Sequence, residues 1–218
     1  MRYGTFFLKE LKYKLPLALV CYALFYAFYG TGLVASYARI ALLFMLLAMT
    51  ASAVLFANLD EMELFMLSRA RLSGAFIVRF LTTYISLALL PGIHFVVDRI
   101  SNQMMISYLT TVLFCCAMGA FWRVLIPTSV YGGILPSYIC CFTMLYSYFP
   151  ANSLADRIFV LVTPFSSAYL ADPEYTRNRL VVTGIALALL LISWIRLRRW
   201  ERASKLFVKV KYYVQSKL

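Results

Sequence analysis

The chain has 218 residues, of which 63% are hydrophobic and only 14% charged, whereas soluble domains carry about 25% charged residues. This length allows one membrane domain with short loops and excludes a separate soluble domain. The net charge of +12 does not point to nucleic acid in so apolar a chain, because basic residues gather at the cytoplasmic rim of membrane proteins, where they meet anionic lipid.

The charged residues lie in short clusters that separate long apolar stretches. Each stretch has roughly 18–30 residues, the length that a helix needs to cross a hydrocarbon core about 30 Å thick. The pattern predicts an all-α integral membrane protein with six transmembrane helices in a single domain. The spans are expected at residues 16–33, 40–58, 75–97, 104–122, 130–149 and 180–195, between an interfacial helix (1–15) and a basic tail (198–218).

Residues 5–14 precede the first span and form an amphipathic pattern. Phe7, Leu8 and Leu11 share one helical face, opposite Lys9 and Lys12. This arrangement predicts a helix that lies in the membrane plane and turns into the first span at Pro16.

The first span also carries a dense aromatic face. Tyr22, Phe25, Tyr26 and Tyr29 recur at helical spacing. Such a face either packs against lipid and neighbouring helices or forms one wall of a path for an apolar substrate.

A short helix is predicted in the loop after the second span, at residues 60–71. Acidic residues at its start and arginines at its end suit the helix dipole, and apolar residues recur on one face. The alternatives are a docking element for a soluble partner or a helix lying flat on lipid. The residues involved are Asp60, Glu61, Met62, Glu63, Phe65, Met66, Arg69 and Arg71.

A few ionisable residues fall inside or beside the third and fourth spans. Arg79 lies a turn or two inside the third span and is expected to extend to the cytoplasmic interface. Arg123 is expected to anchor the end of the fourth span. His94 and Asp98 share a helical face, which we interpret as an interface pair rather than a proton relay or metal site. No bound metal or cofactor is predicted for this chain.

Two later segments and the cysteines complete the pattern. Residues 158–162, followed by Thr163 and Pro164, are too few to cross and predict a partly inserted element. The basic tail has apolar residues every three or four positions and is either a surface helix or an extension of the last span. The five cysteines lie in apolar runs and are interpreted as packing residues.

Six spans would place both termini on one side of the membrane. That side carries most of the lysines and arginines, so the positive-inside rule predicts that both termini are cytoplasmic.

The whole pattern resembles the permease subunit of ATP-binding-cassette (ABC) exporters of the six-span drug, peptide and polysaccharide class. The shared features are the amphipathic N-terminal helix with Lys9-Glu10-Leu11, the acidic-to-basic helix at 60–71, the element containing Pro164-Phe165-Ser166 and the basic tail.

The resemblance implies a multi-pass protein of the cell (inner) membrane that works with ABC ATPase subunits and a second permease, identical or paralogous. ATP and Mg would be bound by the partner ATPase, and residues 60–71 would dock on it. The substrate would be an amphipathic or hydrophobic peptide, lipid or drug. The residues expected to line its path are Tyr22, Tyr26, Tyr29, Met45, Met49, Met144 and Tyr148.

Other functions remain open from the sequence. The chain contains none of the nucleotide-binding, serine-hydrolase or zinc-protease motifs, so we do not expect an enzyme. A membrane component of an importer and an accessory or immunity protein are the alternatives to an exporter permease.

Overall fold

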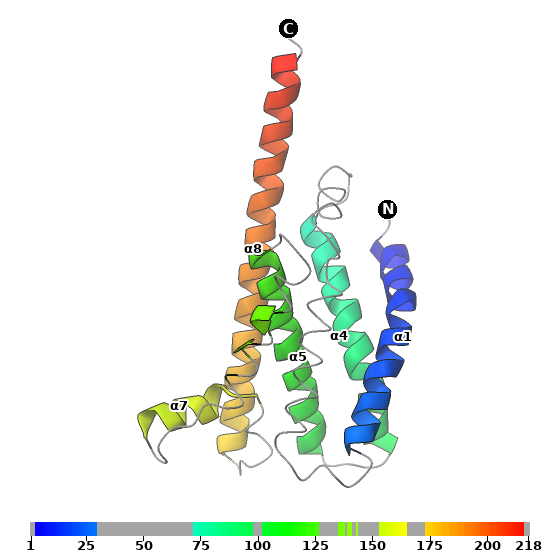
Figure 1. Cartoon of the computed structure of the whole chain (residues 1–218), viewed down its shortest axis with the longest axis vertical. Helices are drawn as coiled ribbons and strands as arrows, with labels where there is room; N and C mark the ends of the chain where they lie inside the picture. Colours follow the sequence, from blue (N-terminus) through cyan, green and yellow to red (C-terminus); the bar gives the residue numbers. More distant parts are fainter. Residues whose placement is uncertain are drawn as a thin grey trace.

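The computed structural model describes residues 3–29, 72–97, 102–126, 135–137, 139–140, 143, 153–164 and 173–215. Within these ranges every regular element is helical and there is no strand. The helices discussed below are α1 (Tyr3–Tyr29), α4 (Leu72–Val97), α5 (Asn102–Leu125), α7 (Leu154–Val162) and α8 (Glu174–Gln215). Figure 1 shows α1, α4, α5 and α8 standing side by side, with α7 crosswise at the end far from both termini.

Three of these helices are long and apolar enough to cross a membrane. They contain Leu72–Leu89, Met105–Leu125 and Glu174–Ala203, which overlap the predicted third, fourth and sixth spans. The predicted all-helical fold is confirmed for the described residues, and the three long apolar helices are consistent with a membrane protein. The second predicted span and most of the fifth lie outside the described residues, and the first falls on α1, which is not among the three. Six spans and cytoplasmic termini therefore stay predictions.

The N-terminal segment differs from its prediction. Helix α1 continues without a break from Tyr3 to Tyr29 with Pro16 inside it, so the expected turn at Pro16 was wrong. The reason lies in the packing: α1 runs beside α4, and Lys14 contacts α4 directly. Residues 5–14 therefore stand along the bundle as the start of a longer helix.

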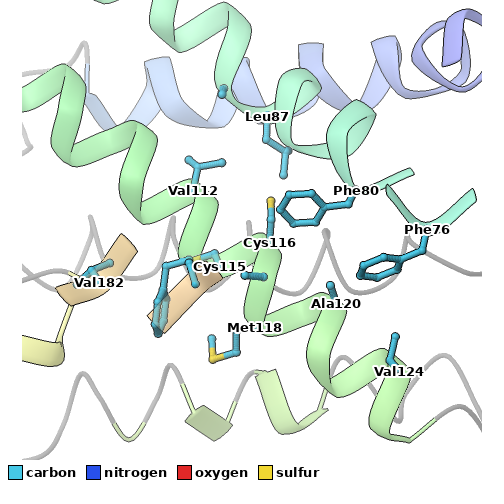
Figure 2. Close-up of a cluster of buried hydrophobic side chains, with 14 of the residues drawn as sticks. Phe76, Phe80, Leu87, Val112, Cys115, Cys116, Met118, Ala120, Val124 and Val182 are labelled. Carbon is cyan, nitrogen blue, oxygen red and sulfur yellow. The ribbon is translucent and has the colours of Figure 1, made fainter. Parts of the chain in front are cut away.

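The core lies where α4, α5 and α8 meet, as Figure 2 shows. Small residues of α5 occupy its centre: Cys115, Cys116, Ala117 and Ala120 are all fully buried. Small side chains let helices approach closely, and close packing holds membrane helices together where lipid removes the hydrophobic driving force. The two cysteines are in no disulfide, and their burial confirms them as packing residues.

Helix α7 is a single short element with its own cap. The Ser153 side chain accepts a hydrogen bond of 3.1 Å from the Asp156 backbone N–H, which is the usual way to satisfy a helix N-terminus. With nine residues, α7 is too short to cross a membrane. This agrees with the prediction of a short element near 158–162.

Helix α8 settles one alternative that the sequence left open. It runs for 42 residues from Glu174 to Gln215 without interruption. The basic tail is thus an extension of the last predicted span rather than a separate surface helix. In Figure 1 the C-terminal part of α8 projects well beyond the other helices.

Candidate functional site

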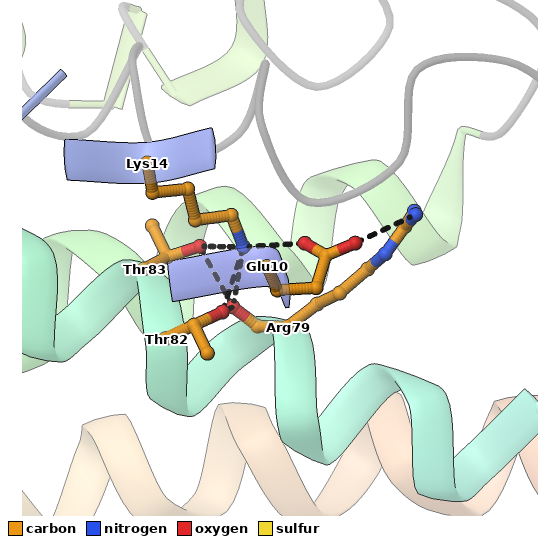
Figure 3. Close-up of polar contacts among 5 residues, drawn as sticks. All are labelled: Glu10, Lys14, Arg79, Thr82 and Thr83. Atoms are coloured by element: carbon orange, nitrogen blue, oxygen red, sulfur yellow. Dashed lines mark hydrogen bonds and ion pairs between the residues drawn. The ribbon is translucent and has the colours of Figure 1, made fainter. Parts of the chain in front are cut away.

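A group of charged and polar side chains lies buried between α1 and α4 (Figure 3). We call it the α1–α4 charge cluster. Its members come from two segments about 65 residues apart in the chain. They are Glu10 and Lys14 of α1 and Arg79, Thr82 and Thr83 of α4.

The α1 part of the cluster is an ion pair one helical turn apart. The Glu10 Oε2 and Lys14 Nζ atoms are 3.2 Å apart, and their side chains are 16% and 5% exposed. Residues at i and i+4 lie on the same helix face. Because both side chains are directed at α4, the charged face of α1 is turned into the bundle.

The α4 part of the cluster offers Lys14 three oxygen atoms. Lys14 Nζ donates to the Arg79 carbonyl oxygen at 3.1 Å and to the hydroxyls of Thr82 and Thr83 at 2.9 and 3.0 Å. Both hydroxyls in turn donate to the same Arg79 carbonyl, at 3.0 and 2.7 Å. Hydroxyls of Ser and Thr often bond the carbonyl three or four residues earlier in a helix. Here these two hydrogen bonds bring the hydroxyl oxygens and the carbonyl oxygen together, and the three oxygens form a binding site for an ammonium group.

The Arg79 side chain completes the cluster. One guanidinium nitrogen lies 3.3 Å from Glu10 Oε1, and the group stacks over the Phe6 ring at 6.0 Å. Arg79 is only 8% exposed. Its guanidinium is held by the Glu10 carboxylate and the Phe6 ring of α1, and the expectation that it extends to the membrane interface stays a prediction.

Two cations share one carboxylate in the cluster. Among its five residues Lys14 and Arg79 are positive and Glu10 is negative, and Arg79 also makes contacts outside this group. Removing charges from water costs several kcal/mol, and a buried ion pair seldom stabilises a protein more than apolar residues would. A charged residue within a membrane-spanning segment is by default a candidate for a functional site, and Arg79 lies within the membrane-compatible part of α4.

A second buried cation, Arg179, lies at the opposite end of the bundle. It is 5% exposed and donates to the Pro164 carbonyl at 2.7 Å and to Thr110 Oγ1 at 2.8 Å. Its neighbour Asn178 accepts from the same guanidinium and donates to the Leu161 carbonyl at 2.9 Å. These bonds tie the segment after α7 to α5 and α8, so we assign this node a structural role.

Further polar side chains are buried at the interfaces of α4, α5 and α8, among them Arg123, Ser73 and Glu201. Arg123 is fully buried in the last turn of α5, and its expected role as an anchor of the fourth span stays a prediction. Ser73 of α4 donates to Glu201 of α8 at 3.2 Å. Among the residues that the structure describes, no group of three His, Cys, Asp or Glu side chains could hold a metal ion.

Most of the residues predicted to form a site lie elsewhere in the chain. The whole docking segment 60–71 is outside the described residues, as are Met45, Met49, Met144 and Tyr148. Tyr22, Tyr26 and Tyr29 belong to α1, but the positions of their side chains are not among those described. His94 is on α4 while Asp98 is outside the described residues, so the predicted pair stays a prediction.

The charge cluster itself was missed by the sequence analysis, although the chain held two signals for it. Glu10 and Lys14 stand at the spacing of a helical ion pair, and two threonines follow Arg79 by three and four residues. What the sequence did not reveal was that these two signals meet.

No protein-family model matches the chain, and neither the curated proteins nor the solved structures contain a match to it.

Proposed function

We propose that this chain is the permease subunit of an ABC exporter that moves an amphipathic or hydrophobic substrate out of the cell. In this proposal a separate ATPase binds and hydrolyses ATP, and a second permease, identical or paralogous, forms the other half of the path. Three membrane-compatible helices support a membrane function. The resemblance of residues 60–71 to a coupling helix supports the ATPase partner.

The observation that carries the proposal is the position of the α1–α4 charge cluster. Helix α4 begins at Leu72, directly after the proposed docking segment. Arg79 follows seven residues later, about 10 Å along the helix. A force applied to the docking segment by an ATPase would therefore enter α4 within two turns of the cluster.

The cluster then connects α4 to the helix that carries the proposed substrate wall. Lys14 and Glu10 belong to α1, and Tyr22 lies eight residues beyond Lys14, about 12 Å along the same helix. The contact between the two helices is made by hydrogen bonds and ion pairs, which are short-ranged and directional. A shift of α4 along its axis would thus be passed to α1 or would break these bonds.

A carboxylate shared by two cations suits an interface with more than one arrangement. Glu10 contacts Lys14 through one oxygen and Arg79 through the other. If α4 slides, Glu10 can keep one cation while it releases the other, so its buried charge always retains a partner. Coupling of this kind needs an element with two discrete arrangements, and we propose that the α1–α4 interface is that element.

The test is copurification. The chain is expressed with its neighbouring genes, purified in a mild detergent and examined for a bound ATPase. We expect one ATPase per permease chain, and loss of it in the double charge reversal Glu61→Lys with Glu63→Lys. Asp98→Lys with Asp172→Lys is the matched control, because it makes the same charge change at the predicted opposite side and should leave the complex intact.

A further variant separates binding from coupling. Glu10→Gln should still copurify with the ATPase, while stimulation of ATP hydrolysis by the reconstituted permease should fall at least severalfold. A chain that elutes alone under every nucleotide condition would overturn the proposal and favour an accessory or immunity protein.

A further inference from the structure

A groove of about 650 Å³ lies between α7 and the first turn of α8. Its volume is within the range of small-ligand sites, about 300–1,000 Å³. Four ionisable side chains line it, two from each helix: Asp156 and Arg157 from α7, and Glu174 and Arg177 from α8. The groove is separate from the α1–α4 charge cluster, which lies on other helices.

The two arginines of the groove are available to a ligand. Arg157 and Arg177 are both exposed, and neither forms an ion pair with another residue that the structure describes. Glu174 likewise forms no ion pair with another residue in the described ranges. Arg157, Arg177 and Glu174 therefore do not form ion pairs with one another, although they line one groove.

The groove is held in shape by buried hydrogen bonds behind it. Asn178, which is fully buried and lines the groove, donates to the carbonyls of Val160 and Leu161 at 2.8 and 2.9 Å. Its amide oxygen accepts from Arg179, which is bonded to α5 through Thr110. Helix α7 is thus fixed against α8, and the site is largely formed before any ligand arrives.

The groove also lies where lipid headgroups are found. The membrane-compatible part of α8 begins at Glu174, so the first turn of α8 would lie near one membrane surface if this helix crosses the membrane. Helix α7 lies crosswise there (Figure 1), and it exposes Leu154 and Ile158 at 75% and 53%. A short helix with exposed apolar side chains at this depth is expected to rest on the membrane with those side chains among the acyl chains.

The lining chemistry selects a particular ligand class. Guanidinium groups match phosphate oxygens in a bidentate geometry, and carboxylates attract ammonium groups. The two arginines and Glu174 present both signs of charge to the groove, which suits a ligand that has both signs. We propose that the groove binds the phosphate–ammonium headgroup of a zwitterionic membrane lipid, with Arg157 and Arg177 on the phosphate and Glu174 on the ammonium. This proposal does not depend on the transport function.

The test uses the full chain in detergent and measures binding of dioleoyl phosphatidylethanolamine by native mass spectrometry. Arg157→Gln with Arg177→Gln should weaken binding roughly tenfold, as expected for losing charge-assisted hydrogen bonds. Arg199→Gln with Arg202→Gln removes two exposed arginines from the far part of α8 and should bind like the wild type. Equal thermal unfolding of the two double variants shows that any difference is local.

Two more measurements identify the ligand. Glu174→Gln should abolish the preference for phosphatidylethanolamine over phosphatidylglycerol, which has phosphate but no ammonium. Water-soluble phosphoethanolamine should displace the lipid only weakly, because it has no acyl chains to lie beside Leu154 and Ile158. Displacement as efficient as by the lipid itself would assign the groove to a soluble ligand, and unchanged lipid binding in the Arg157/Arg177 variant would overturn the site altogether.

Discussion

Lys14 and Arg79 carry the same charge, yet the Lys14 ammonium lies 3.1 Å from the Arg79 backbone carbonyl. The arrangement is possible because the Arg79 side chain points away to Glu10 while its carbonyl, which is an acceptor, faces Lys14. Glu10 then stands between the two cations and contacts both. The stability of the α1–α4 interface should therefore depend more on the single carboxylate than on either cation.

Replacing Glu10 should lower the stability of the folded protein more than replacing Lys14. Glu10→Gln leaves two buried cations with no carboxylate between them, whereas Lys14→Met leaves the Glu10–Arg79 pair with no net charge. Breaking a buried pair costs about 3–5 kcal/mol, and we expect Glu10→Gln to approach the lower figure. Thermal unfolding in detergent measures both variants.

The informative result is which of the two variants, Glu10→Gln or Lys14→Met, destabilises the protein more. A matched substitution outside the cluster, Lys12→Met on the exposed side of α1, should change unfolding little. If Lys14→Met proved the more damaging variant, the sharing of one carboxylate by two cations would not govern the stability of the cluster, and the charge argument would have to be abandoned.

The two threonine hydroxyls should stabilise the protein only through Lys14. Thr82→Val with Thr83→Val keeps the side-chain shapes but removes two hydrogen-bond acceptors, each worth about 0.5–1.5 kcal/mol. In a Lys14→Met background the same change should cost much less, since residues in one network are not additive. Thr5→Val, at an exposed position of α1, is the control, and full additivity would argue against the ammonium site.

At the other end of the bundle, lysine should not be able to replace Arg179. Its planar guanidinium reaches Pro164, Thr110 and Asn178 at once, which a single ammonium cannot imitate. Arg179→Lys should speed hydrogen exchange in α7 while leaving α1 and α4 protected. Arg202→Lys, at an exposed site of α8, should change nothing. Uniform exchange throughout the chain would instead indicate global destabilisation.

The continuity of α8 can be measured directly. Spin labels at positions 180 and 202, both exposed, are separated by 22 residues, which corresponds to about 33 Å in an unbroken helix. Double electron–electron resonance in a cysteine-depleted background should give a narrow distribution of label-to-label distances near that value. A clearly shorter distance would mean that the basic tail folds back onto the membrane.

The long apolar runs made three membrane helices predictable, because length and lack of charge determine membrane crossing almost by themselves. The short α7 was foreseen for the same reason, since too few apolar residues lie between Asp156 and Pro164. The continuity of α1 was not foreseen. A proline usually ends or bends a helix, and only the packing of α1 along α4 shows that here it does not.

The charge cluster could not be predicted because its partners come from distant parts of the chain. Arg79 alone, near the end of an apolar run, indicates a side chain that reaches the interface. Its actual orientation depends on Glu10, 69 residues earlier. The predicted docking segment and most of the proposed substrate wall lie outside the described residues, so those assignments stay predictions.

The uninterrupted α8 has a mechanical consequence. It is held at one end by the hydrogen bonds of Arg179 and again at Glu201, which accepts a hydrogen bond from Ser73 of α4. Beyond Glu201 the helix continues for 14 residues to Gln215, a length of about 21 Å. A tilt of about 10° at Glu201 would move the far end sideways by about 4 Å at this helical rise, so a small rearrangement where α4 meets α8 would become a larger displacement at the end of α8.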